Sequence, residues 1–270
     1  MLTSVKNPLV KLMRQLHQAK GRRQQQQFLL EGTHLLEEAL AVQHPLTVVC
    51  STPTWQTRYP ELWQKIQAQT PRAETVSPEV LQAMATTVHP DGVVAMAVRH
   101  PSGNSHPDTD QAFSLTLGVA VETLQDPGNL GTMIRTAAAV AADGLWLSAN
   151  SVDSDHPKVL RASAGQWFRL PLYSCADLTQ QVNQWRRAGL QIIATQSQAS
   201  TLYWELDLRQ PTIILLGNEG AGLSPELVEA ATAQACIPLA PSVESLNVAV
   251  TAALMLYEVR RQRLKTEAWP

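Results

Sequence analysis

Apolar residues in the second half of the chain fall into short runs that alternate with stretches of helical spacing. Runs rich in Val, Ile and Leu predict buried parallel strands at residues 115–121, 145–147, 191–194 and 213–216. Stretches of helical periodicity follow them, at residues 130–142, 178–187, 225–233 and 246–264. This strand-then-helix order predicts an α/β domain in which helices cover both faces of a parallel sheet.

The first part of the chain shows the same alternation on a smaller scale. Short apolar runs predict strands at residues 28–30, 47–50, 74–76 and 93–98, and helical spacing predicts helices at 33–42, 57–69 and 78–84. Ser77-Pro78-Glu79 is typical of a helix start, because serine caps the helix, proline fits its first turn and a carboxylate faces the positive end of the dipole.

A polar stretch separates the two parts. Residues 100–111 contain no apolar side chain other than proline, which is typical of a linker. We therefore predict a smaller N-terminal α/β domain at 1–100, a linker at 101–112 and a C-terminal domain at 113–270. A chain of 270 residues is long enough for two modest domains.

Basic residues are distributed unevenly, although the formal net charge is only -2. Residues 1–30 contain six basic side chains and no acidic one. Such a segment on a near-neutral protein can form an arm that contacts the phosphates of a nucleic acid. A solvated helix face explains the same pattern equally well. The residues that we expect to contact RNA are Lys6, Lys11, Arg14, Arg22 and Arg23.

The composition, with 44% hydrophobic and 16% charged residues, is that of a globular protein with a substantial core. Cys50, Cys175 and Cys236 lie far apart and the histidines have no metal-binding spacing, so we expect neither a disulfide framework nor a metal site. No apolar run approaches the ~20 residues that span a bilayer, and the N-terminus lacks the apolar stretch of a signal peptide. We expect a cytoplasmic protein without membrane contact.

Three polar turns lie in the C-terminal part, at residues 126–135, 216–225 and 237–248, each between an extended segment and a helical stretch. In the first turn, Asn129 is a natural helix cap. Asn129, Thr132 and Arg135 recur every third residue, so we expect one stripe at a helix start. A guanidinium there can hold a phosphate or carboxylate, and a surface ion pair is an equally good explanation.

The second turn is rich in glycine, which lets a ligand approach the backbone closely. It matches neither the phosphate-binding loop that ends in Gly-Lys-Ser/Thr nor the dinucleotide fingerprint. Glu219 repels a phosphate, so the turn suits a ligand with hydroxyl, amino or cationic groups, or is a plain glycine turn. In the third turn, Ser245 and Asn247 flank Leu246, and either polar residue can cap the helix that follows.

Together these segments resemble the three signature motifs of the SpoU (TrmH-like) RNA 2′-O-ribose methyltransferases. The motifs correspond to residues 126–139, 216–224 and 237–258, and a subsidiary stretch at 157–165 is also similar. The resemblance covers nearly all of residues 115–264 in order, spacing and residue identity. The N-terminal part is more loosely similar to the α/β RNA-binding domain that many members carry.

The resemblance implies a deep trefoil knot in the C-terminal domain, a homodimer, and S-adenosyl-L-methionine bound in a bent form within the knotted loops. The methyl-donor contacts of the family map onto Gly217, Ile237 and Leu246, with Thr195, Leu239 and Glu219 as further candidates. The catalytic arginine of the family maps onto Arg135, supported by Asn129, Glu219, Ser245 and Asn247.

The chain departs from the family pattern in the third motif. Leu239 replaces the usual methionine, and Pro241 stands where many members have glycine. Proline fixes φ and removes a backbone donor, so we expect the loop on the adenine side of the methyl donor to be shaped differently.

The implied reaction is an in-line displacement in which a ribose 2′-hydroxyl attacks the sulfonium methyl group. A guanidinium, with a pKa above ~12, is a poor base. We therefore expect Arg135 to hold the adjacent phosphate and stabilise the developing alkoxide, while phosphate or water accepts the proton. Ribosomal RNA is the favoured substrate. The alternatives are transfer RNA and a non-catalytic role in RNA binding or ribosome assembly.

Overall fold

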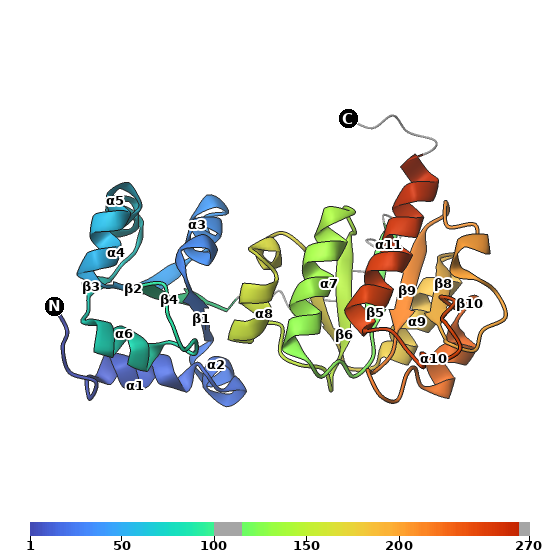
Figure 1. Ribbon diagram of the computed structural model, residues 1–270, viewed down its shortest axis with the longest axis horizontal. Coiled ribbons are helices and arrows are strands. Elements are labelled where there is room, and N and C mark those ends of the chain that lie inside the picture. Colours follow the sequence, from blue (N-terminus) through green and yellow to red (C-terminus); the bar gives the residue numbers. More distant parts are fainter. Residues whose placement is uncertain (100–114, 265–270) are drawn as a thin grey trace. The chain divides into compact units, whose positions relative to one another are not determined.

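The computed structural model describes residues 1–99 and 115–264, which form two compact units (Figure 1). The first unit contains residues 1–99 together with 153–168, and the second contains residues 115–152 and 169–264. The predicted linker at 101–112 lies outside the described residues. The contacts thus place the segment 153–168 with the N-terminal unit, whereas we expected it within the C-terminal domain.

The first unit is built on a mixed four-stranded sheet in the order β1-β4-β2-β3. Strand β4 pairs antiparallel with β1 and β2, and β3 pairs parallel with β2. Alternate residues of β4 enter opposite cores, with Val93 and Ala95 in one and Val94 and Met96 in the other. Each strand lies within one residue of its predicted bounds: β1 Gln27–Glu31, β2 Leu46–Ser51, β3 Ala73–Thr75 and β4 Val93–Val98.

Helices cover both faces of this sheet. Figure 1 shows α1 and α6 on one side and α3, α4 and α5 on the other. Met13 of α1 and Met84 of α6 pack in one core, whereas Leu36 of α3, Trp55 of α4 and Leu160 of α8 pack in the other. The bounds are α1 Pro8–Gln15, α2 Ala19–Gln25, α3 Thr33–Ala41, α4 Pro53–Arg58, α5 Pro60–Gln69, α6 Pro78–Met84 and α8 Pro157–Ala162.

Two helices test the sequence rules directly. Helix α6 has its predicted bounds, and the Ser77 hydroxyl caps it by accepting from the Val80 N–H at 3.4 Å. The single helix predicted at 57–69 is wrong, because α4 ends at Arg58 and α5 begins at Pro60, with Tyr59 as the cap residue between them. Pro60, the first residue of α5, has no N–H to continue the helical hydrogen bonds of α4.

Arg22 in α2 lies in a buried cluster of charged side chains within the first unit. Its guanidinium donates to Asp153 and Asp155 at 2.9 Å each and to the Leu16 carbonyl at 3.1 Å, and the side chain is 1% exposed. The neighbouring Arg23 also pairs with Asp153, at 2.8 Å, but is 63% exposed. Arg22 therefore has no surface to offer a phosphate, and our prediction that it contacts RNA is wrong.

The second unit contains six parallel strands in the order β10-β8-β9-β5-β6-β7, which confirms the predicted α/β class. Helices α7 and α11 lie side by side (Figure 1), whereas α9 and α10 contribute to a core with Ile213 and Leu215. The bounds are β5 Leu117–Val121, α7 Pro127–Ala139, β6 Gly144–Ser148, β7 Leu172–Cys175, α9 Leu178–Arg187, β8 Gln191–Thr195, β9 Thr212–Leu216, α10 Pro225–Ala230, β10 Ala233–Ala235 and α11 Val248–Leu264.

The edge strands β7 and β10 were not predicted, because they are short and only partly buried. The predicted helix at 225–233 is too long. Thr232, which follows α10, exchanges hydrogen bonds with Ile192 of β8 and so leads the chain into the sheet. The trefoil knot stays a prediction. Of the helices that the structure describes, none is long and apolar enough to cross a membrane.

The parallel pairing places the carboxyl ends of four strands next to one another, on one side of the sheet. Ala235 pairs with Thr195, Ala194 with Leu215, and Leu216 with Val121, so β10, β8, β9 and β5 end side by side. The three polar turns follow the ends of β5, β9 and β10, within five residues of each.

We predict that Arg22→Ala destabilises the protein far more than Arg23→Ala. Removing Arg22 leaves buried carboxylates undercompensated, which costs about 3–5 kcal/mol, whereas an exposed ion pair contributes about 0–1 kcal/mol. Urea unfolding of the two variants gives both values. Equal losses for the two arginines would contradict the buried cluster.

Candidate functional site

The first polar turn leads into α7, and Asp126 rather than Asn129 caps this helix. The Asp126 carboxylate accepts from the Gly128 N–H, and α7 begins at Pro127. Our prediction of Asn129 as the cap is therefore wrong. Because it lies inside the first helical turn, Asn129 has its side chain available for contacts with the other two turns.

Glu219, in the second turn, holds the start of α7. Its carboxylate accepts from the Asn129 amide and the Asp126 N–H at 3.2 Å each, and from the Gln125 N–H at 3.3 Å. Partial burial alone would raise the pKa of Glu219, but these hydrogen bonds and one to its own backbone lower the pKa below its ordinary value. Glu219 is therefore ionised at neutral pH.

Asn247, in the third turn, completes the connection. Its amide nitrogen donates to the Asn129 side-chain oxygen at 2.9 Å, and its own side-chain oxygen accepts from the Ala249 N–H at 2.9 Å and so caps α11. Glu219, Asn129 and Asn247 thus form one hydrogen-bonded chain across three turns that are far apart in sequence. Ser245, two residues before Asn247, is exposed.

The predicted cofactor residues lie at three neighbouring strand ends. Thr195 ends β8 and donates its hydroxyl to the Leu215 carbonyl at 2.9 Å, Gly217 follows β9, and Ile237 follows β10 by two residues. Ile237, Leu239 and Leu246 are half-buried. A Cβ added at Gly222 would meet nothing within 4 Å, which leaves open space beside the glycine turn. Exposed backbone next to half-buried apolar side chains fits a ligand with polar and apolar parts.

Pro241 occupies a turn that suits it. The Val243 N–H donates to the Ala240 carbonyl at 2.9 Å, so Pro241 is the second residue of a four-residue turn. This position favours the fixed φ of proline and requires no N–H donor. The departure from glycine therefore stiffens this loop without interrupting a hydrogen bond.

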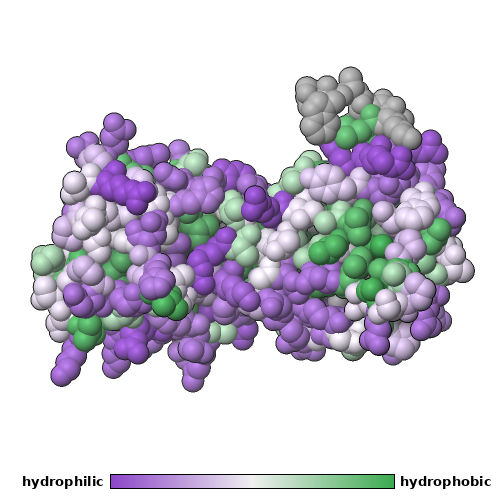
Figure 2. All heavy atoms as spheres, viewed as in Figure 1, coloured by the Kyte–Doolittle hydropathy of each residue, from purple (hydrophilic) through white to green (hydrophobic). Residues whose placement is uncertain are grey.

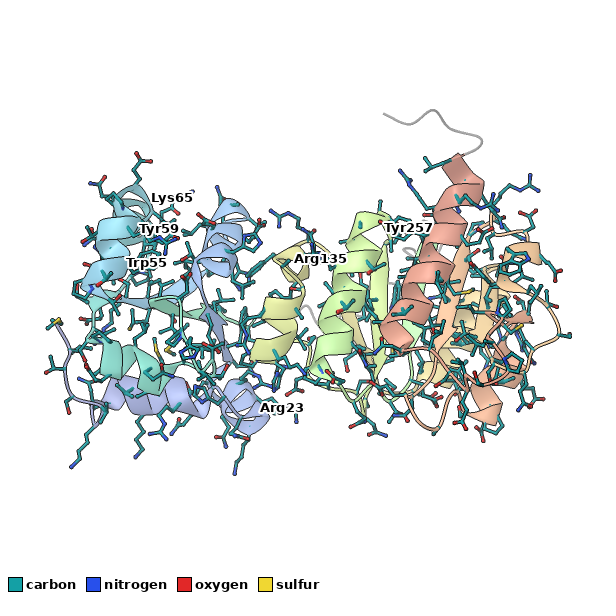
Figure 3. All side chains as sticks on the ribbon, viewed as in Figure 1. Arg23, Trp55, Tyr59, Lys65, Arg135 and Tyr257 are labelled. Atoms are coloured by element: carbon teal, nitrogen blue, oxygen red, sulfur yellow. The ribbon has the colours of Figure 1, made fainter. Side chains whose placement is uncertain are left out.

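Arg135 does not share a face of α7 with Asn129. Six residues at ~100° each place the two side chains about 120° apart around the helix, so the predicted single stripe is wrong for Arg135. Thr132 is only about 60° from Asn129 and lines the same groove. Arg135 is exposed (Figure 3), and no hydrogen bond or ion pair joins it to any other described residue.

An open groove with a volume of about 620 Å³ runs between α7 and α11. Asn129 and Asn247 lie in its wall, and Figure 2 shows apolar side chains gathered over these two helices. Val250 and Tyr257 of α11 are 46% and 54% exposed, although both are large apolar or aromatic residues. The remaining lining residues are Thr132, Tyr203, Ala249, Ala253, Leu254, Glu258 and Arg261.

Sequence reasoning missed two polar residues of the site. The Glu122 carboxylate accepts from the Ser224 N–H at 2.7 Å, and the Asn218 amide donates to the Thr123 carbonyl at 2.8 Å. Both lie close to the end of a buried strand, since Glu122 follows β5 directly and Asn218 comes two residues after β9. That position is the signal that could have identified them. In the first unit, the predicted RNA contacts other than Arg22, which are Lys6, Lys11, Arg14 and Arg23, are exposed.

Comparison with known proteins identifies the family. The sequence matches the SpoU rRNA Methylase family over residues 116–257 and the MRM3-like substrate binding domain over residues 7–95. An uncharacterized tRNA/rRNA methyltransferase of Synechocystis is 50% identical over 97% of this chain and 94% of its own length. The 23S rRNA (guanosine(2553)-2'-O)-methyltransferase RlmP of Bacillus subtilis is 32% identical over 96% of this chain and 98% of its own length.

A solved structure agrees with these relatives. The AdoMet-bound rRNA methyltransferase from Sinorhizobium meliloti has a TM-score of 0.81 and 32% identity, and the match covers 96% of this chain and 97% of that one. The chain therefore belongs to the SpoU rRNA methylase family.

We predict that Gly217→Ala disrupts the second turn, whereas Gly220→Ala is tolerated. A Cβ at Gly217 would lie 2.1–2.4 Å from backbone atoms of Gly222 and Leu223, whereas at Gly220 the nearest atom is the Asn218 side-chain oxygen at 3.7 Å. Forcing this backbone apart costs about 1–3 kcal/mol. Thermal unfolding of both variants checks the difference, and equal melting temperatures would contradict the close crossing at Gly217.

Proposed function

We propose that this protein transfers the methyl group of S-adenosylmethionine to a ribose 2′-hydroxyl of ribosomal RNA. The observation that carries the proposal is the Glu219–Asn129–Asn247 hydrogen-bonded chain, which joins the three motif turns at one edge of the sheet. The relatives support the substrate class, since the name of the Bacillus subtilis relative specifies 2′-O-methylation of 23S rRNA. Transfer RNA is the alternative substrate.

The cofactor site is formed by Gly217, Ile237 and Leu246, with Thr195, Leu239 and Glu219 beside them. S-adenosylmethionine, when bound there, supplies a methyl group that is already activated for displacement. Ile237 and Leu246 cover apolar parts of the ligand, and the glycine turn presents backbone groups to its polar parts. Glu219 serves this site through Asn129 and the start of α7, because its carboxylate already accepts three hydrogen bonds from them.

The chemistry at the ribose needs orientation and charge stabilisation. Asn129 and Asn247, supported by Ser245, would orient the ribose where the three motif turns meet. Arg135 has no protein partner among the described residues, so its guanidinium is available to grip a phosphate beside the target ribose and to stabilise the alkoxide that forms. The proton of the hydroxyl passes to that phosphate or to water, because a guanidinium holds its own proton at neutral pH.

RNA affinity comes mainly from the first unit in this proposal. Lys6, Lys11, Arg14 and Arg23 are exposed and can contact phosphates. The knotted topology and a cytoplasmic setting also belong to the proposal. A role in RNA binding or ribosome assembly without turnover is the competing function, and only detection of methyl transfer separates the two.

The direct experiment incubates the protein with S-adenosylmethionine labelled in its methyl group and with ribosomal or transfer RNA from a strain that lacks this protein. We expect label in ribosomal RNA at one ribose, which mapping of 2′-O-methyl positions identifies. Label in transfer RNA alone would select the alternative substrate. RNA binding without transfer to either RNA would overturn the enzymatic proposal.

Arg135→Ala is expected to lower the single-turnover methylation rate on the order of 10²-fold or more, the scale for removing one transition-state donor. Arg135→Lys should also fail, because an ammonium cannot reproduce the planar bidentate grip on phosphate. Calorimetric affinity for S-adenosylmethionine should be unchanged in both. Near-normal turnover by either variant would assign Arg135 to the surface rather than to the reaction.

A second copy of this chain is the occupant that we propose for the groove between α7 and α11. Two copies related by a twofold axis would cover the same exposed apolar residues on each other. Sedimentation should give about twice the 29.6 kDa chain mass. Val250→Glu should yield monomers, while Val88→Glu, a matched change at a 77% exposed residue of the first unit, should not. Monomeric wild-type protein at micromolar concentration would contradict this assembly.

A further inference from the structure

Thr123 has an unusual backbone conformation at the point where the chain leaves β5. Its φ is +51°, and it is the single β-branched residue among the five non-glycine residues with positive φ in the described part of the chain. A β-branched side chain in the left-handed region is strained and persists only where its surroundings hold it. Strain of this kind concentrates at functional sites.

The backbone at Thr123 is held from two sides. On one side, the Thr123 N–H donates to the Ser148 hydroxyl at 2.7 Å, and the Leu124 N–H donates to the Ser151 hydroxyl at 3.1 Å. On the other side, the Asn218 amide donates to the Thr123 carbonyl at 2.8 Å. The serines come from the end of β6 and the turn after it, whereas Asn218 comes from the glycine turn.

Asn218 also shapes the glycine turn itself. Its side-chain oxygen accepts from the Gly220 and Ala221 N–H groups at 2.9 and 3.0 Å, and its backbone exchanges two hydrogen bonds with Gly222 at 3.0 Å each. One amide side chain therefore fixes the glycine turn with its oxygen and the Thr123 turn with its nitrogen. Glu122 adds a parallel connection through Ser224.

The direction of the chain after Thr123 determines where α7 begins. Gln125 and Asp126, which come two and three residues after Thr123, donate their N–H groups to Glu219. Asn129 and Arg135 then follow in α7 at fixed angles. A change in the Thr123 turn would consequently shift both side chains with respect to the glycine turn.

We infer that Asn218 and Thr123 are positioning residues for methyl transfer. The Asn218 amide holds Thr123 in its left-handed conformation and so sets where α7 carries Asn129 and Arg135. The inference rests on the proposed function, and it adds two residues that touch neither ribose nor phosphate in that proposal.

Asn218→Asp separates the two roles of the amide, because the carboxylate keeps an acceptor for Gly220 and Ala221 but has no donor for the Thr123 carbonyl. Asn218→Ser is a neutral second variant, whose side chain is too short to reach that carbonyl. Asn183→Asp is the matched control, because the Asn183 amide also donates to a carbonyl, that of Thr179 in α9, at 3.0 Å.

Hydrogen exchange tests, without requiring turnover, whether the Asn218 amide holds the Thr123 turn and the residues that follow it. Loss of one hydrogen bond should speed exchange of the Gln125 and Asp126 amides on the order of 10-fold in both Asn218 variants. Asn183→Asp should leave these amides unchanged. Wild-type exchange rates in both Asn218 variants would overturn the inference, whatever the RNA assays give.

Kinetics test the functional part. We expect both Asn218 variants to lose kcat on the order of 10-fold or more, with S-adenosylmethionine affinity within about threefold of wild type. Thr123→Asn should retain kcat, because asparagine adopts the left-handed conformation readily. If the wild type methylates RNA and the Asn218 variants match its kcat, the positioning role fails while the proposed function stands. If the wild type transfers no methyl group, the functional role of both residues falls with the proposed function.

Discussion

The carboxylate of Glu219 is the acceptor on which the site depends. Parallel pairing places the carboxyl ends of β10, β8, β9 and β5 next to one another. This pairing alone leaves the turns that follow these strands free to move apart. Glu219 binds two backbone N–H groups at the start of α7 and the amide of Asn129, which in turn meets Asn247. The same hydrogen bonds lower the pKa of Glu219 below its ordinary value, because they stabilise its charged form. Three segments distant in sequence become one site through this carboxylate.

Sequence patterns predicted the elements that position the site more reliably than its internal contacts. Buried apolar runs located β5, β6, β8 and β9, since these strands lie inside the sheet and need apolar residues on both faces. The edge strands β7 and β10 lack that signal. Local rules also assigned the α7 cap to Asn129, whereas Asp126 takes that role and leaves Asn129 to long-range partners. Tertiary contacts determine which of the two residues caps the helix, and the spacing of residues in the sequence does not reveal these contacts.

Charge was the least reliable sequence feature for predicting which side chains are exposed and can contact RNA. Arg22 and Arg23 are adjacent and identical in type, yet one is buried between two aspartates and the other is exposed. Asp153 and Asp155, which decide the difference, are about 130 residues away along the chain. The motif resemblance supplied the five residues that we propose for catalysis. It did not point to Asn218 or Thr123, because their proposed role comes from a backbone angle and from contacts between the turns. The turn that accommodates Pro241 is likewise visible only in the structure.

A double-mutant cycle between Glu219 and Asn129 tests most directly whether the carboxylate organises the site. The single-turnover methylation rate is measured for the wild type, Asn129→Ala, Glu219→Ala and the double variant. If Glu219 acts through Asn129 and the start of α7, the two losses are strongly non-additive, and the double variant is little slower than Glu219→Ala alone. Fully additive losses would mean that the two side chains act independently, and would contradict the role of Glu219 described above.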